Sequence, residues 1–204
     1  MPTRIRWALI AAVPLAALAA VSLAFALRSS GSPSAVAASS AEDLITWKPG
    51  EQPSPPIALH AADGSPLTLT SLRGRRVIVT FVDPHCTTFC PRESLVIDDA
   101  VRQLPAAERP IVLAVSVDPT VQSPRVLQGE AKRFRWLPQW RWAKGTHAEL
   151  AVVWRKYHVT VLPTADDITH TELAYVVDAN GDQRALLLWP FKRADVTRAL
   201  AAAS

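Results

Sequence analysis

The feature that most constrains this chain is an apolar run that leads directly into its only two cysteines. Residues 77–82 read VIVTFV, which is typical of a buried β-strand. Cys86 and Cys90 follow closely, and Pro91 then opens a segment whose apolar residues recur at helical spacing. The sequence therefore predicts a strand, a turn that carries both thiols, and a helix. Such a pair can form a disulfide, exchange one, or hold a soft metal ion.

The N-terminus predicts export of the rest of the chain. No charged residue occurs from Trp7 to Leu27, and arginines flank the stretch on both sides. A helix over this stretch is long enough to span a hydrocarbon core of about 30 Å. A cleaved signal sequence is the alternative, but its apolar region is usually only about 7–15 residues long. We therefore predict that residues 1–28 form a single-pass anchor in the cytoplasmic membrane, with the C-terminal domain on the periplasmic side.

The charge balance gives no reason to expect nucleic acid as a partner. The net charge is +4, but without Arg4, Arg6 and Arg28 there are 19 basic and 18 acidic residues. The basic clusters at 73–76 and 132–135 are typical of solvated faces.

Export also affects how the cysteines are interpreted. Disulfides persist outside the cytoplasm, so a structural bridge is the default role for an exported pair. A bridge that closes so short a loop restrains the unfolded chain little, which makes a purely stabilising role a poor explanation. The only methionine is the first residue, so the exported domain has no thioether ligand to offer.

The exported part divides into a tether and a domain. Residues 29–56 are rich in Ser, Ala and Pro and predict a flexible tether. Residues 57–204 predict one α/β domain in which helices flank a mixed sheet. We expect strands at 57–60, 67–69, 76–82, 111–117, 173–177 and 184–188, and helices at 91–104, 121–134, 146–157 and 191–203. Turns at Asp63-Gly64 and Asn180-Gly181 predict two hairpins, and the Trp-rich residues 136–145 are expected to form a loop.

The thiols suit a soft ion as well as redox chemistry. A helix N-terminus lowers a thiol pKa, and Cys90 occupies that position directly before Pro91. The spacing of Cys86 and Cys90 lets both sulfurs point to one side, and it equally permits a disulfide. A structural zinc site would need two histidines in addition, whereas Cu(I) needs only one imidazole.

The sequence alone does not identify that imidazole among five histidines. His85 adjoins Cys86, but neighbours along a chain rarely aim at one centre. His170 follows a polar loop and precedes the strand at 173–177, which suits a ligand and a surface residue equally well. The other three have nothing in their context that converges with the thiols: His60, His147 and His158.

From about Ile57 to its end, the chain resembles the Sco/SenC family of thioredoxin-like copper proteins. The resemblance is carried by the strand ending at Phe81, the Cys-x-x-x-Cys-Pro motif at 86–91, and the segments 115–119 (VSVDP), 157–159 (YHV), 170–171 (HT) and 175–181 (YVVDANG). It implies a thioredoxin-like fold and Cu(I), or alternatively Cu(II), held by Cys86, Cys90 and His170. It also implies delivery of copper to, or thiol reduction of, the dinuclear copper centre of a cytochrome c oxidase subunit, with other copper chaperones as further partners.

Two departures from the family pattern leave the partner open. Thr87-Thr88-Phe89 stands where an acidic residue is common, and Thr169 rather than aspartate precedes His170. A copper chaperone is the leading interpretation. The enzyme alternative is a thiol–disulfide oxidoreductase that cycles Cys86 and Cys90 without obligatory metal. A redox or copper sensor ranks last, because no signalling domain is recognisable.

Overall fold

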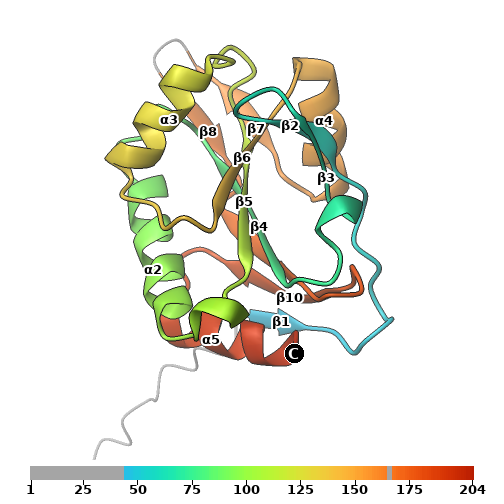
Figure 1. Cartoon of the computed structure of the whole chain (residues 1–204). Coiled ribbons are helices and arrows are strands. Elements are labelled where there is room, and N and C mark those ends of the chain that lie inside the picture. Colours follow the sequence, from blue (N-terminus) through green and yellow to red (C-terminus); the bar gives the residue numbers. More distant parts are fainter. Residues whose placement is uncertain (1–43, 165–166) are drawn as a thin grey trace, which may run out of the picture. The chain divides into compact units, whose positions relative to one another are not determined.

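The computed structural model describes residues 44–164 and 167–204, which form an eight-stranded sheet, a small two-stranded sheet and the helices around them (Figure 1). The predicted anchor at 1–28, and the predicted tether as far as residue 43, lie outside the described residues. In the part of the chain that is described, every helix is too short or too polar to cross a membrane.

The strands of the large sheet lie in the order β1-β10-β9-β4-β5-β6-β2-β3. They are β1 (Leu44–Thr46), β2 (Ala58–Ala61), β3 (Pro66–Thr68), β4 (Val77–Val82), β5 (Ile111–Ser116), β6 (Trp140–Lys144), β9 (Leu173–Val177) and β10 (Gln183–Leu188). The small sheet pairs β7 (Val161–Pro163) with β8 (Ile168–His170). The helices are α2 (Cys90–Arg102), α3 (Pro124–Arg133), α4 (His147–Lys156) and α5 (Arg193–Ala202), with 3₁₀ turns η1 (Thr70–Leu72) and η2 (Ala106–Glu108).

The centre of the sheet is the parallel pair β4 and β5, and every residue of both strands is buried. Burial on both faces explains their near-continuous apolar sequences. β9 pairs antiparallel with β4 on the other side, and the predicted hairpins β2–β3 and β9–β10 are present. The prediction of a mixed α/β sheet flanked by helices is confirmed.

Alternating residues of β4 point into two separate cores. Ile78 and Val82 face the core built with α2, α3 and α5, whereas Val79 and Phe81 face the core built with α4. Figure 1 shows α2 and α5 on one side of the strands and α4 on the other. The cysteine turn that follows β4 is thus held between a fully buried strand and the start of α2.

Three predictions about individual segments need correction. Residues 136–145 are not simply a loop, because β6 lies within them and extends the parallel pairing from β5. Two alternate residues of this strand, Trp140 and Trp142, are buried and pack in the core built with α2. The hairpin of β7 and β8 was not expected either, and it places His170 at the end of a strand.

The third correction concerns where the folded domain begins. Its predicted start at Ile57 is too late, because β1 already pairs with β10. Further contacts fix the following residues: the Trp47 N–H donates to the Arg184 carbonyl at 3.0 Å, and the Tyr157 hydroxyl donates to the Pro55 carbonyl at 2.8 Å. Residues 44–56 are therefore part of the fold, despite a Pro- and Ser-rich composition that is typical of a tether.

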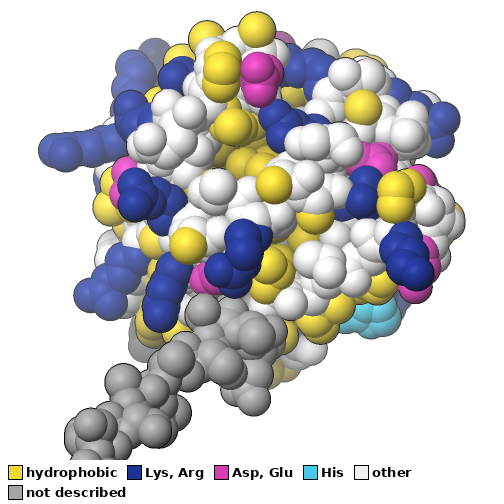
Figure 2. All heavy atoms as spheres, turned by 90° about the horizontal axis from the view of Figure 1, so that it is seen from below, with side chains coloured by type: hydrophobic (Ala, Val, Ile, Leu, Met, Phe, Trp, Pro, Cys, Tyr) yellow, Lys and Arg dark blue, Asp and Glu magenta, His cyan; other side chains and the backbone are white. Residues whose placement is uncertain are grey.

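The surface agrees with the balanced charge of the sequence. In the view of Figure 2, lysine and arginine side chains are dispersed among other residues and do not gather into one continuous field. Some arginines on the described surface serve structural roles. Arg76, for example, donates to the carbonyls of Glu108 and Leu200 at 2.7 and 3.1 Å.

Candidate functional site

The two cysteines are free thiols with different surroundings. Cys86 is half-buried in the turn after β4, while Cys90 is the first residue of α2 and only 2% exposed. The backbone N–H of Cys90 donates to Cys86 Sγ at 3.3 Å, and the Thr88 hydroxyl lies 3.8 Å from the same sulfur. The helix N-terminus therefore acts on Cys86.

This arrangement reverses the prediction for the thiol pKa values. A hydrogen bond from the Cys90 thiol, with further bonds from the Cys90 N–H and Thr88, lowers the pKa of Cys86 to about 5. The bond that Cys90 gives to Cys86, together with its own burial, strongly raises the pKa of Cys90. The expectation that Cys90 carries the thiolate was wrong, because the first residue of a helix aims its N–H at a group before the helix.

The turn that carries Cys86 is fastened from α3. Arg133 Nη2 donates to the carbonyls of Pro84 and Cys86, both at 3.0 Å, and Arg133 itself pairs with Glu130. Within the turn, the carboxylate of Asp83 accepts the His85 N–H at 2.9 Å. These bonds hold the backbone on both sides of the thiolate, so Cys86 is presented on a fixed loop.

His170 and Cys86 line the same pocket of about 510 Å³. His170 Nδ1 lies 3.0 Å from the carbonyl oxygen of Thr171. Since a carbonyl can only accept, Nδ1 carries the proton and Nε2 keeps its lone pair, which is the form of imidazole that binds a metal. Phe89, Leu188 and Trp189 line the same pocket, and Phe89 is 48% exposed.

The structure therefore brings Cys86, Cys90 and His170 to one region without assembling them as a ligand set. Across residues 44–164 and 167–204, no three His, Cys, Asp or Glu side chains are close enough together to hold a metal ion. His85 is exposed and lines a separate pocket with Asp83 and Asp118. The remaining histidines, His60, His147 and His158, do not line the Cys86 pocket and are not part of α2.

Beneath the thiols lies a buried acid that the sequence analysis missed. Glu93 is fully buried on α2, and its Oε1 is 2.6 Å from Thr80 Oγ1, which is itself 3.2 Å from the Leu173 carbonyl oxygen. A hydroxyl has one hydrogen, so Thr80 cannot donate to both oxygens at once. With Glu93 protonated, the carboxyl donates to Thr80 and Thr80 donates to Leu173, and every group is satisfied.

The pKa of Glu93 agrees with this geometry. Burial raises it to about 8, and the negative charges of Glu172 and Cys86 add to the rise. Burial likewise raises the pKa of Glu172 to about 7 at the rim of the His170 pocket. Two signals in the sequence point to the buried pair: Thr80 interrupts an apolar strand, and Glu93 lies one helical turn before the buried Ile97.

Comparison with known proteins gives a family and a fold. The family model SCO1/SenC matches residues 48–203. Copper-bound ScoI of Bradyrhizobium japonicum is 24% identical with a TM-score of 0.64, covering 74% of this chain and 99% of that chain. Copper-bound yeast Sco1 is 22% identical with a TM-score of 0.62, covering 74% and 87%.

A third similar structure is that of BsSco, a member of the Sco family of cytochrome c oxidase assembly proteins in which a disulfide switch was identified. It is 21% identical with a TM-score of 0.63, covering 78% of this chain and 96% of that chain. No curated protein sequence gives a significant match to the chain. The folds agree over 87–99% of each of these three chains, which confirms the thioredoxin-like architecture.

Proposed function

We propose, from the premise that this chain belongs to the SCO1/SenC family, that it is a copper chaperone whose cargo is bound by Cys86, Cys90 and His170. The observation that carries the proposal is the pocket shared by a stabilised thiolate at Cys86 and an imidazole whose Nε2 is free. Thiolates favour Cu(I), and imidazole suits copper as well. Copper-bound relatives of the same fold support this choice of ion.

The protein side of copper loading follows from the thiol environments. Cys86 is already ionised near neutral pH, so it can receive the ion first, whereas Cys90 must give up its proton to become a second ligand. Loading one Cu(I) therefore releases one proton from the pair. His170 must also come closer to the sulfurs, because the three side chains are not gathered in the structure.

We further propose that the copper is delivered to the dinuclear copper centre of a cytochrome c oxidase subunit. The relative described as belonging to the oxidase assembly family supports this partner, as does the exposed apolar rim of Phe89 and Leu188 beside Cys86. Anchoring by residues 1–28 in the cytoplasmic membrane would keep the domain on the periplasmic side. Protease accessibility in spheroplasts tests this orientation.

The copper proposal is tested on the reduced full-length chain in detergent, under anaerobic conditions. We expect one Cu(I) per chain in competition with a chromophoric chelator, and sulfur and nitrogen ligands by X-ray absorption. His170→Ala should weaken binding at least about tenfold and remove the nitrogen ligand. His60→Ala, at an exposed site on β2, is the matched control, and His85→Ala tests the neighbouring imidazole. Unchanged affinity and spectrum in His170→Ala would exclude the three-ligand site.

A second function, thiol–disulfide exchange, is favoured by the asymmetry of the pair. The accessible Cys86 thiolate can attack a target disulfide, which gives a mixed disulfide and a target thiolate. Cys90 then loses its proton and attacks Cys86, so the chain ends as a disulfide and the target as a dithiol. This reaction needs no histidine. Target reduction that survives His170→Ala and is lost in Cys86→Ser would therefore assign it separately from copper binding.

A further inference from the structure

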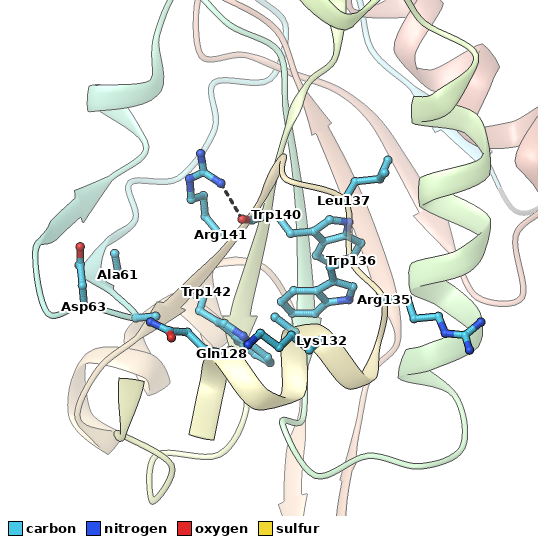
Figure 3. A pocket seen from close by; sticks show the side chains of 12 residues that line it. Ala61, Asp63, Gln128, Lys132, Arg135, Trp136, Leu137, Trp140, Arg141 and Trp142 are labelled. Carbon is cyan, nitrogen blue, oxygen red and sulfur yellow. Dashed lines mark hydrogen bonds between the residues drawn. The ribbon is translucent and has the colours of Figure 1, made fainter. Parts of the chain in front are cut away.

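Three tryptophans at the junction of α3 and β6 line a second pocket, of about 540 Å³. Figure 3 shows the rings of Trp136, Trp140 and Trp142 together, with Lys132 beside them and Arg135 and Arg141 extending outward on either side. The pocket shares no residue with the one that holds Cys86 and His170. Its lining consists of Ala61, Ala62, Asp63, Gln128, Ala131, Lys132, Arg135, Trp136, Leu137, Trp140, Arg141 and Trp142.

The apolar wall of this pocket is rigid. The Trp136 ring stacks on Trp140 with centroids 4.3 Å apart and lies 4.6 Å from the Trp142 ring. Each indole N–H is used inside the protein: Trp136 donates to Ser94 Oγ, Trp140 to Asp98 Oδ1 and Trp142 to the Leu127 carbonyl, at 2.9, 2.6 and 2.8 Å. Trp140 and Trp142 are themselves buried, so the apolar surface open to a ligand is chiefly that of the half-buried Trp136 and Leu137. Because the buried rings hold Trp136 in place, this surface loses little conformational entropy when a ligand binds.

The rim of the pocket carries positive charge that the described residues leave uncompensated. Lys132, Arg135 and Arg141 are all exposed. Within the described part of the chain, none of the three forms a salt bridge, and Arg141 donates only to the carbonyls of Pro138 and Trp140. The single acidic residue of the lining is Asp63 on the β2–β3 turn. The complementary ligand is thus apolar at its centre and anionic at its ends.

We infer that this Trp pocket docks an acidic peptide segment of a partner protein, with one aromatic or leucine side chain as its anchor. Three cations around an apolar pocket fit a short peptide better than a nucleic acid, which needs a longer basic track along its backbone. An apolar anchor ringed by charge is also the usual composition of a protein–protein contact.

Hydrogen bonds connect the Trp pocket to the cysteine turn. Arg133, next to Lys132, donates to the Cys86 carbonyl, and Trp136 donates to Ser94, whose hydroxyl donates to the Cys90 carbonyl at 2.7 Å. The residues around the Trp pocket therefore also help to hold the backbone of the cysteine turn in place.

The docking is tested by fluorescence anisotropy on the full-length chain in detergent, with a labelled peptide of sequence Glu-Asp-Leu-Phe-Asp-Glu and without copper. We expect saturable binding that weakens as salt is raised, and at least about tenfold weaker binding for a peptide with Ser in place of Leu and Phe. A peptide with Lys in place of the acidic residues should not bind. Failure of peptide binding would leave the copper titration unaffected, so the two proposals fail separately.

Charge reversal locates the site. Lys132→Glu with Arg135→Glu should weaken peptide binding at least about tenfold at unchanged melting temperature, because both side chains are exposed and neither forms a hydrogen bond or ion pair with residues 44–164 or 167–204. Arg155→Glu with Lys156→Glu, at exposed positions of α4, is the matched control. Trp136→Leu tests the apolar wall in the same way.

Three results would overturn the inference. One is no saturable binding of the acidic peptide below about 1 mM. Another is equal weakening by the two charge-reversed pairs, which would mean attraction to the whole surface. The third is tight binding of free indole-3-acetate where the peptide does not bind, which would make the pocket a small-molecule site.

Discussion

The two faces of the central sheet bury different chemistry. Among the rings packed on the α4 face, the buried polar atoms are neutral donors. Tyr175 donates its hydroxyl to the Tyr157 carbonyl, and Trp154 donates its indole N–H to the Ser116 carbonyl, both at 3.1 Å. On the opposite face, helix α2 itself buries two carboxyl groups, Glu93 and Asp98, and burial raises the pKa of both. Cys90 belongs to this second core.

The difference separates stability from reactivity. A neutral hydroxyl or indole N–H that finds a carbonyl acceptor costs little when buried, so the apolar area of the α4 face contributes to stability with little offset. A buried carboxyl costs free energy whenever it ionises. The α2 face keeps such groups within reach of the charge on Cys86, which makes the thiol site sensitive to pH in a way that the α4 face is not.

The largest expected effect is loss of stability from the α4 face. Leu150→Ala removes a fully buried side chain of α4 and should lower the free energy of unfolding by about 2–5 kcal/mol. The pKa of Cys86 should stay unchanged, because no group near the sulfur is altered. Chemical denaturation and the pH dependence of alkylation of Cys86 measure the two quantities. Val152→Ala, on the exposed side of the same helix, should cost less than about 0.5 kcal/mol, and an equal loss would contradict the assignment.

The next effect is a pH dependence that belongs to the α2 face. The pKa of Glu93 is about 8 in the folded chain against an ordinary value of 4.5, so the folded state binds more protons between these values. Its contribution to stability is complete below pH 4.5 and is lost as the pH rises through 8, with a slope of at most about 1.4 kcal/mol per pH unit.

Glu93→Gln tests this slope, because the amide keeps a donor for Thr80 and cannot ionise. Stability measured from pH 5 to pH 9 should fall less steeply in this variant than in the unmodified chain. Glu108→Gln, at an exposed site, should leave the slope as it is. A slope that is the same in all three proteins would mean that Glu93 is ionised when folded.

The fold was largely predictable because its patterns are local. The VIVTFV run, the Asn180-Gly181 turn and the Thr146–Glu149 capping box each contain the interaction that forms them, and all three appear as predicted. β6 was missed because a tryptophan side chain suits a loop as well as a core. Only the partners of the indole N–H groups, Asp98 and Leu127, show that Trp140 and Trp142 are buried. β1 was missed because a short edge strand takes its stability from β10, far along the chain.

The sequence names the candidate site residues, but it does not predict which of the two thiols ionises. Cysteine spacing and family resemblance select Cys86, Cys90 and His170, and the structure places them in one region. Which thiol ionises depends on the direction of the Cys90 backbone N–H and on the burial of each thiol, and neither can be inferred from the spacing of the cysteines. The Glu93–Thr80 pair joins α2 to β4 and likewise depends on packing.

A smaller effect concerns the coupling between the two thiols. Cys90→Ala removes the thiol that donates to Cys86 and should raise the pKa of Cys86 by at least about one unit, or about 1.4 kcal/mol. The backbone N–H remains, so the pKa should still lie below 9.0, its ordinary value. Alkylation rate against pH gives the value. Cys90→Ser, which keeps a donor, should show a smaller rise, and equal values for both variants would remove the Cys90 thiol as the cause.

The smallest effect returns to the α4 face. Thr146 Oγ1 accepts the Glu149 N–H at 3.3 Å, and Glu149 Oε2 accepts the Thr146 N–H at 2.7 Å. Thr146→Ala should therefore cost about 1 kcal/mol in chemical denaturation, because one helical N–H loses its acceptor. Thr197→Ala, inside α5, removes the same atoms without a cap and should be near neutral, since its hydroxyl only returns to the Arg193 carbonyl. Neither change should alter the pKa of Cys86. A shift in Thr146→Ala would mean that the α4 face also sets the reactivity of the thiols.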